Sequence, residues 1–206
     1  MTEIILDLDP ELVRDAEERA RELIRCGFLE QDEVAEVLLD SFDDPGLDVE
    51  HADEIVAPLW EARLAEQESW PEVTDVDRLA EAFDALEAQG IVAEMDFTCC
   101  ARCGYAEIGA EADEDSHGFV FFHEQDTERA AAGQGLTLRY GAFRAAEGTE
   151  DAAGPGDSAA ETEETAAVGR AVVAALAKAG LRTQWDGSPD EVILVTPLNW
   201  LNRLPE

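Results

Sequence analysis

The segment GFVFFH, residues 118–123, is an almost continuous run of apolar and aromatic residues. Such a run is typical of a buried strand, because aromatic side chains favour strands and a buried strand has little need of polar positions. A chain with this segment is therefore expected to build its fold around a sheet that other elements cover.

Further strands and helices are indicated on both sides of this segment. Alternating or apolar runs predict four more strands, and the last two form a hairpin around the turn DGSPD. These strands cover residues 91–97, 136–143, 181–185 and 191–195. Helical spacing of apolar residues predicts three helices. These helices cover residues 74–90, 125–133 and 165–180. The pattern predicts an α+β fold with a mixed or antiparallel sheet of about five strands and three helices.

The chain also divides along its length. Residues 1–70 are predicted to be helical, with Asp9 as an N-terminal cap and Pro10 in the first helical position. Residues 74–206 are predicted to form the α+β domain. Within it, residues 145–164 are small and acidic, without large apolar side chains, so burial offers little to offset the entropy of ordering them. This segment is expected to be a disordered acidic loop.

The charge balance limits the kinds of partner. The chain has 49 acidic and 14 basic residues, and its formal net charge is −35. Phosphate backbones and anionic membranes repel such a surface, so we expect neither nucleic acid nor a membrane as partner. The acidic excess fits a solvated surface, and it also fits an interaction or immunity-type protein that binds a basic partner.

The first residues bear on the location of the protein. The start, MTEIILDLDP, is acidic and its apolar run is too short for a secretory signal. No apolar stretch approaches the ~20 residues of a membrane helix. We therefore expect a cytoplasmic protein, where permanent disulfides are disfavoured and clustered cysteines point to metal binding or catalysis.

Three of the four cysteines lie within FTCCARCGYAEI, residues 97–108. Cys100 and Cys103 have the C-x-x-C spacing that brings two thiolates to one zinc ion. Cys99 is a poorer third ligand, because neighbouring side chains tend to point apart. His123, at the end of the aromatic strand, is the best distant ligand. A structural zinc ion is therefore one expected cofactor.

Two other interpretations of the cysteines stay open. A C-x-x-C pair at a helix start has its thiolate stabilised by the helix dipole, which suits thiol-dependent redox or hydrolytic activity at Cys100, Cys103 and His123. Free cysteines are also among the most buried residues, so these thiols would equally suit a strand–helix junction in a core.

Several polar residues are candidates for a pocket beside the cysteines. Gln125 and Asp126 follow the aromatic strand, where ligand sites are common, and Glu107 closes the cysteine segment. Asp186 begins the hairpin turn, and Trp185 lies directly before it, where an indole ring suits ligand stacking. Two of them have a structural alternative: Asp126 is expected to cap a helix, and Trp185 to pack in the core or at its rim.

Four segments together resemble a bacterial, mainly actinobacterial, family of unknown function. The segments are TDVDRLAEAFDALEAQGIVAEMDFTCCARCGYAEI, GFVFFHEQDTERA, LTLRYG and VGRAVVAALAKAGLRTQWDGSPDEVILV. The resemblance covers roughly Thr74 to Arg203 and implies a shared fold without a known activity. We expect an acidic, soluble, non-enzymatic binding or regulatory protein whose Cys/His cluster is structural.

Overall fold

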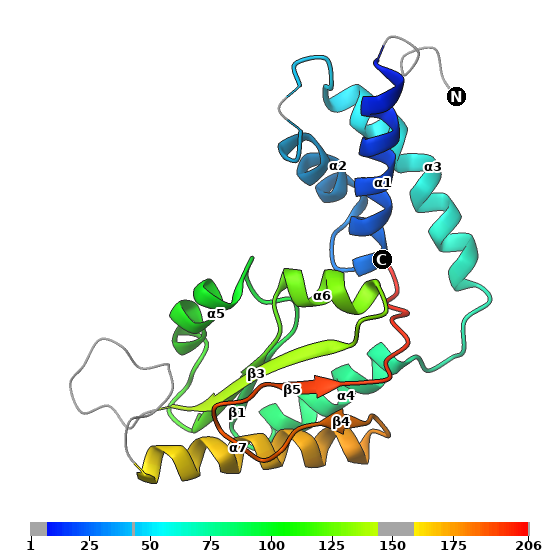
Figure 1. Cartoon of the computed structure of the whole chain (residues 1–206). Helices are drawn as coiled ribbons and strands as arrows, with labels where there is room; N and C mark the ends of the chain where they lie inside the picture. Colours follow the sequence, from blue (N-terminus) through cyan, green and yellow to red (C-terminus); the bar gives the residue numbers. More distant parts are fainter. Residues whose placement is uncertain (1–7, 43, 144–158, 206) are drawn as a thin grey trace. The chain divides into compact units, whose positions relative to one another are not determined.

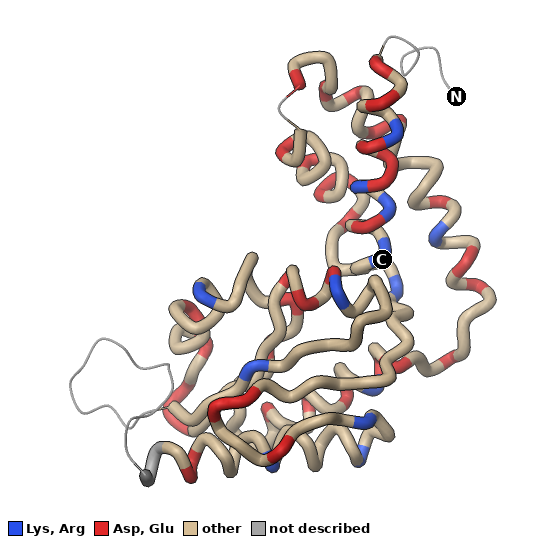
Figure 2. Tube along the Cα trace, in the orientation of Figure 1, with Lys and Arg blue, Asp and Glu red and all other residues tan. Residues whose placement is uncertain are grey.

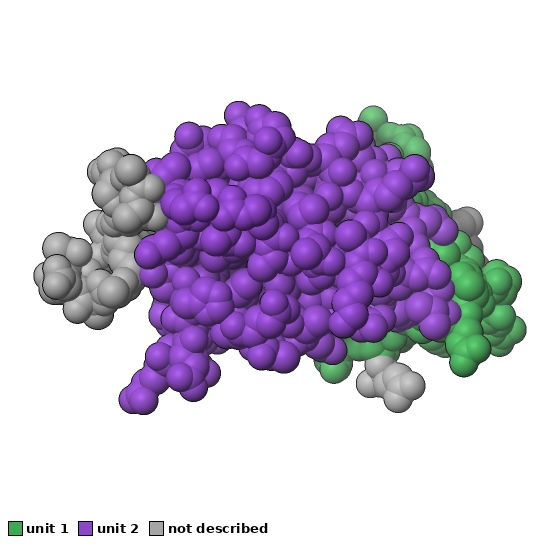
Figure 3. Space-filling model, turned by 90° about the horizontal axis from the view of Figure 1, so that it is seen from below, with its two compact units in different colours: residues 1–72, 201–206 green, residues 73–200 purple. Residues whose placement is uncertain are grey.

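The chain forms two compact units (Figures 1 and 3). The helical unit comprises residues 1–72 and 201–206, and the α+β unit comprises residues 73–200. The structure is a computed structural model that describes residues 8–42, 44–143 and 159–205.

The helical unit contains three helices, as the N-terminal sequence predicts. They are α1 (Pro10–Cys26), α2 (Gln31–Asp40) and α3 (Val49–Gln67). The Asp9 side chain accepts a hydrogen bond from the Glu11 N–H at 2.8 Å, so it caps α1 as expected. Gly27 ends α1 with a φ of 77°, a left-handed conformation that glycine adopts without steric cost.

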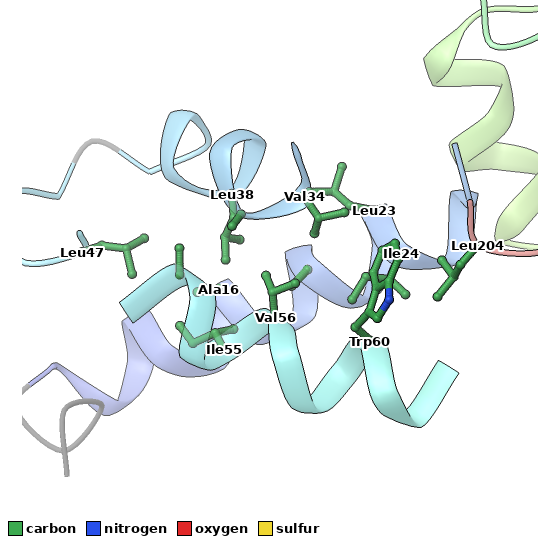
Figure 4. Close-up of a cluster of buried hydrophobic side chains, with 13 residues drawn as sticks. Ala16, Leu23, Ile24, Val34, Leu38, Leu47, Ile55, Val56, Trp60 and Leu204 are labelled. Atoms are coloured by element: carbon green, nitrogen blue, oxygen red, sulfur yellow. The ribbon is translucent and has the colours of Figure 1, made fainter. Parts of the chain in front are cut away.

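The core of the helical unit also includes the end of the chain. Apolar side chains from all three helices pack together, and Leu204 joins them (Figure 4). The Asn202 side-chain amide donates hydrogen bonds to the carbonyl oxygens of Cys26 and Gly27, each at 3.0 Å. The last residues are therefore held by both burial and hydrogen bonds, a long-range pairing that local sequence patterns do not encode.

The α+β unit is built on a five-stranded mixed sheet. The strands are β1 (Ile91–Glu94), β2 (Gly118–Phe121), β3 (Leu136–Ala142), β4 (Thr183–Gln184) and β5 (Ile193–Val195). Their order is β1-β2-β3-β5-β4. β1 and β2 are parallel, and the other neighbouring pairs are antiparallel. All four residues of β2 are buried. The expected α+β class with a mixed sheet of five strands is confirmed.

Helices cover both faces of this sheet (Figure 1). α4 (Asp75–Glu87) and α7 (Ala159–Lys178) lie on one face, and α5 (Ala101–Glu107) and α6 (Glu124–Ala131) lie on the other. The described residues thus hold seven α-helices, and the prediction of three in this domain was one short. The missing helix is α5, which is too short to carry a periodic apolar pattern.

Only the last part of the predicted acidic loop, residues 159–164, can be compared with the structure. Residues 145–158 lie within the segment outside the described residues. Residues 159–164 belong to α7, so the prediction that the loop extends to residue 164 was wrong. The segment AAETEE consists mostly of alanine and glutamate, which are strong helix formers, and this explains the earlier start of the helix.

Acidic residues occur along the chain in both units, and basic residues are far fewer (Figure 2). None of the helices in the described ranges combines the length and the apolar character needed to cross a membrane.

Candidate metal centre

The loops that follow β1 and β2 are neighbours, because parallel strands end at the same edge of a sheet. The β1 loop leads through the three cysteines into α5, and the β2 loop leads through His123 into α6. The Phe97 N–H donates to the Phe122 carbonyl at 2.8 Å, and the Glu124 N–H donates to the Thr98 carbonyl at 3.2 Å. These bonds hold the two backbones together.

The three cysteines of the β1 loop form one sulfur cluster. The Sγ atoms of Cys99, Cys100 and Cys103 all lie within 4.8 Å of one another, and those of Cys99 and Cys103 are 3.7 Å apart. Two thiolates on one tetrahedral zinc ion lie about 3.8 Å apart when each Zn–S bond is about 2.3 Å. The spacing therefore suits a shared metal ion.

The exposure of the three cysteine side chains decides whether they are core residues or are accessible for metal binding or thiol chemistry. Cys99 is exposed, and Cys100 and Cys103 are half-buried, so they are not core residues. The expectation that Cys99 points away from its neighbours is not met. Cys100 is extended and Cys103 lies in the first turn of α5, which folds the later sulfur back toward the earlier two.

The cluster favours one thiolate in the absence of metal. The Cys103 N–H donates a hydrogen bond to the Cys100 sulfur and lowers the pKa of Cys100, helped by the thiols of Cys103 and Cys99. The pKa of Cys103 is raised to about 11, first by its hydrogen bond with Cys99 and then by Cys100. A bound metal ion would displace the remaining thiol protons.

The position of α5 depends on Gly104. A Cβ atom at this glycine would lie only 2.4 Å from Cε2 of Phe121, whose ring is fully buried. The next residue, Tyr105, packs its ring edge-on against Phe121 with centroids 5.2 Å apart. The glycine that follows the third cysteine thus lets α5 lie directly on β2.

The loop before the cysteines has an unusual backbone. Asp96 and Thr98 have φ values of 54° and 59°, a left-handed conformation that non-glycine residues rarely adopt. The Thr127 hydroxyl donates a hydrogen bond to Asp96, and the Thr98 hydroxyl donates to the Cys100 carbonyl at 3.2 Å. Burial raises the pKa of Asp96 to about 6, against the opposing effect of the Thr127 hydrogen bond. Conformations of this kind persist only where the surroundings hold them.

The side chain of His123 is turned toward α6. It is buried, and its Nε2 atom lies 3.1 Å from Oδ2 of Asp126. The sulfur cluster does not include His123 among the residues that the structure describes. Burial lowers the pKa of His123, while the Asp126 carboxylate opposes that shift. The backbone neighbours the cysteines as expected, but the imidazole does not join the sulfur group.

Asp126 has a different role from the predicted one. His123 is the N-cap of α6, so the prediction that Asp126 is the N-cap was wrong; as the third helical residue, Asp126 instead accepts a hydrogen bond from the His123 N–H at 3.4 Å in a capping box. Asp126 is fully buried and forms a short ion pair with Arg139 of β3. A fully buried carboxylate needs such partners, and Arg129 of α6 supplies a second guanidinium, whose Nη1 atom lies 3.6 Å from Oδ1 of Asp126.

The other predicted pocket residues belong to three separate segments, namely α5, α6 and the turn after β4. Glu107 and Gln125 are exposed, on α5 and α6. The Trp185 indole N–H donates to the Tyr140 hydroxyl at 2.9 Å, and a Cβ at Gly169 would touch the Trp185 ring, which places Trp185 against α7. Asp186 is exposed, and its carboxylate accepts the Ser188 N–H at 2.8 Å.

The fold and the sulfur cluster define an α+β protein with a three-thiol site at the sheet edge. A profile of the family described as "Domain of unknown function (DUF6891)" matches residues 9–204. The chain therefore belongs to this family, which includes the N-terminal helices as well as the region from Thr74 onward that the sequence resemblance covers. No curated protein and no solved structure gives a significant match.

Proposed function

We propose that this protein is a zinc-binding protein with a regulatory rather than an enzymatic role. The zinc ion is held by the thiolates of Cys99, Cys100 and Cys103, and its fourth coordination position is open to solvent. The observation that carries the proposal is the spacing of the three sulfur atoms, all within 4.8 Å of one another.

The chemistry of the donor set supports zinc over harder cations. Thiolates select soft or borderline metal ions, whereas Mg²⁺ and Ca²⁺ require oxygen ligands. Within the described part of the chain, no carboxylate belongs to the sulfur group. Hydrogen bonds from the backbone N–H groups of Cys103 and Arg102 lower the pKa of Cys100, which favours a thiolate ready to coordinate metal.

Metal analysis of the purified, reduced protein tests this function. We expect one zinc ion per chain, and a loss of affinity of at least about 100-fold in Cys99→Ser, Cys100→Ser or Cys103→Ser, since a lost ligand should cost no less than a lost outer-shell contact. Cys26→Ser is the matched control, because Cys26 is buried in the helical unit. A metal-free wild type, or equal losses in Cys26→Ser, would refute the proposal.

The lowered pKa of Cys100 favours a second candidate, a thiol-dependent activity at the same cluster. Alkylation of the metal-free protein with iodoacetamide across a pH series tests it. The candidate predicts that Cys100 reacts at lower pH than Cys103, whose pKa is raised. Equal profiles for the two thiols would remove this candidate without touching the metal proposal.

A further inference from the structure

Building on the zinc site proposed above, we infer that the same thiols form a redox switch. A hydroperoxide joins Cys99 to Cys103 as a disulfide, and the zinc ion is released. The oxidants are hydroperoxides. Whether the site holds zinc then depends on whether Cys99 and Cys103 are thiolates or a disulfide.

The sulfur positions support this pairing. The Sγ atoms of Cys99 and Cys103 are 3.7 Å apart, which is close to van der Waals contact. A disulfide bond is about 2.05 Å long, so the two atoms need to approach by less than about 2 Å. Cys99 lies in the loop just before α5, and α5 itself is only seven residues long. A shift of this size is therefore confined to the loop and the first helical turn.

Exposure selects the thiolate that reacts first. In the zinc-bound protein all three thiols are deprotonated by coordination, so their metal-free pKa values no longer decide the order. Cys99 is exposed, whereas Cys100 and Cys103 are half-buried. The oxidant therefore meets Cys99 first, and the Cys103 sulfur lies 3.7 Å from the Cys99 sulfur.

The reaction balances in two steps. The Cys99 thiolate attacks the outer oxygen of the hydroperoxide, an S–O bond forms, the O–O bond breaks, and an alkoxide or hydroxide leaves. The Cys103 thiolate then attacks the Cys99 sulfenic acid, the S–S bond forms, and hydroxide leaves. The thiols lose two electrons that the peroxide gains, while zinc keeps its oxidation state. A disulfide sulfur is no longer a thiolate ligand, so only Cys100 remains to hold the ion.

Peptide mapping after equimolar hydrogen peroxide tests the switch in the zinc-loaded full-length protein. Trypsin cuts after Arg102, so the digest separates peptide 79–102, with Cys99 and Cys100, from peptide 103–129, with Cys103. We expect the two peptides to be joined under non-reducing conditions. A chromogenic chelator should detect zinc release in proportion to this product, and a thiol reductant should reverse both changes.

Variants distinguish the pairing from its alternatives. The joined peptides should persist in Cys100→Ser and Cys26→Ser and disappear in Cys99→Ser and Cys103→Ser. Joined peptides in Cys99→Ser, or a disulfide without zinc release in the wild type, would overturn the inference. If the wild type holds no zinc, the proposed function fails by metal analysis, and mapping of the metal-free protein still decides the Cys99–Cys103 pairing.

Discussion

Thr127 in α6 donates its hydroxyl hydrogen to Asp96, 31 residues earlier, in the loop that leads to the three cysteines. Thr127 is buried, so this bond fixes the loop from inside the protein. In Thr127→Val the shape is kept but the donor is lost, and the half-buried carboxylate of Asp96 loses its partner. We expect the free energy of unfolding to fall by about 1–3 kcal/mol. Zinc affinity should fall with it, and Thr127→Ser should retain both. Unchanged zinc affinity in a destabilised Thr127→Val would show that the bond does not position the site.

The raised pKa of Asp96 should make the free energy of unfolding depend on pH. Its pKa is raised from 3.8 to about 6 by burial, with Glu124 and Glu128 adding to the effect. Between these pH values the folded protein binds more protons at Asp96 than the unfolded protein does. This carboxyl therefore lowers the free energy of unfolding as pH rises from about 4 to about 6.

Asp96→Asn isolates this effect, because asparagine tolerates the left-handed backbone and still accepts the Thr127 hydrogen bond. We expect the variant to be more stable than the wild type above pH 6, by on the order of 1–2 kcal/mol after allowance for partial solvent screening. The difference should vanish below pH 4. Denaturant unfolding at several pH values measures it, and a variant less stable than the wild type at pH 7 would contradict the expected sign.

Gly104 and Gly109 provide a matched pair of substitutions. In Gly104→Ala the new methyl group overlaps the buried Phe121 ring, so we expect a loss of about 1–3 kcal/mol in the free energy of unfolding and weaker zinc binding. A Cβ at Gly109 meets no atom within 4 Å, so Gly109→Ala should be neutral or slightly stabilising. Equal stabilities for the two variants would mean that α5 does not rest on β2 as described.

Among the substitutions proposed here, loss of the ion pair between Asp126 and Arg139 should lower the free energy of unfolding most. Asp126→Asn removes the charge that balances Arg139, and breaking a buried ion pair in this way costs about 3–5 kcal/mol. Glu107→Gln neutralises an exposed carboxylate on α5 and should change stability by less than about 0.5 kcal/mol. Thermal or denaturant unfolding compares them, and a small effect at Asp126 would contradict its assigned structural role.

Much of the fold follows from local patterns. The aromatic run at residues 118–123 predicts the buried β2, and the hairpin around DGSPD predicts the pairing of β4 with β5. Patterns of this kind depend on neighbours along the chain. The association of Leu204 with the helical unit depends on contacts more than a hundred residues apart in sequence, so no local signal reports it.

In the candidate metal centre, too, local patterns predict some features, and others depend on contacts between distant parts of the chain. The spacing of Cys100 and Cys103 predicts that their two sulfur atoms lie close together, and in the structure both belong to the sulfur cluster. The residues that hold the loop were not predicted. A signal for Arg139, the partner of Asp126, was present, since Arg139 is the one charged residue in the strand segment LTLRYG. No sequence pattern reports the left-handed backbone of Asp96, because glycine usually marks that conformation and aspartate adopts it only occasionally.

Zinc-edge X-ray absorption spectroscopy of the zinc-loaded protein tests the ligand set most directly. The three-thiolate site predicts three sulfur ligands at about 2.3 Å and one lighter atom at about 2.0–2.1 Å, without the scattering pattern of an imidazole ring. A shell of two sulfur atoms with an imidazole would place His123 on the metal and contradict the site, and a shell of oxygen and nitrogen alone would rule it out.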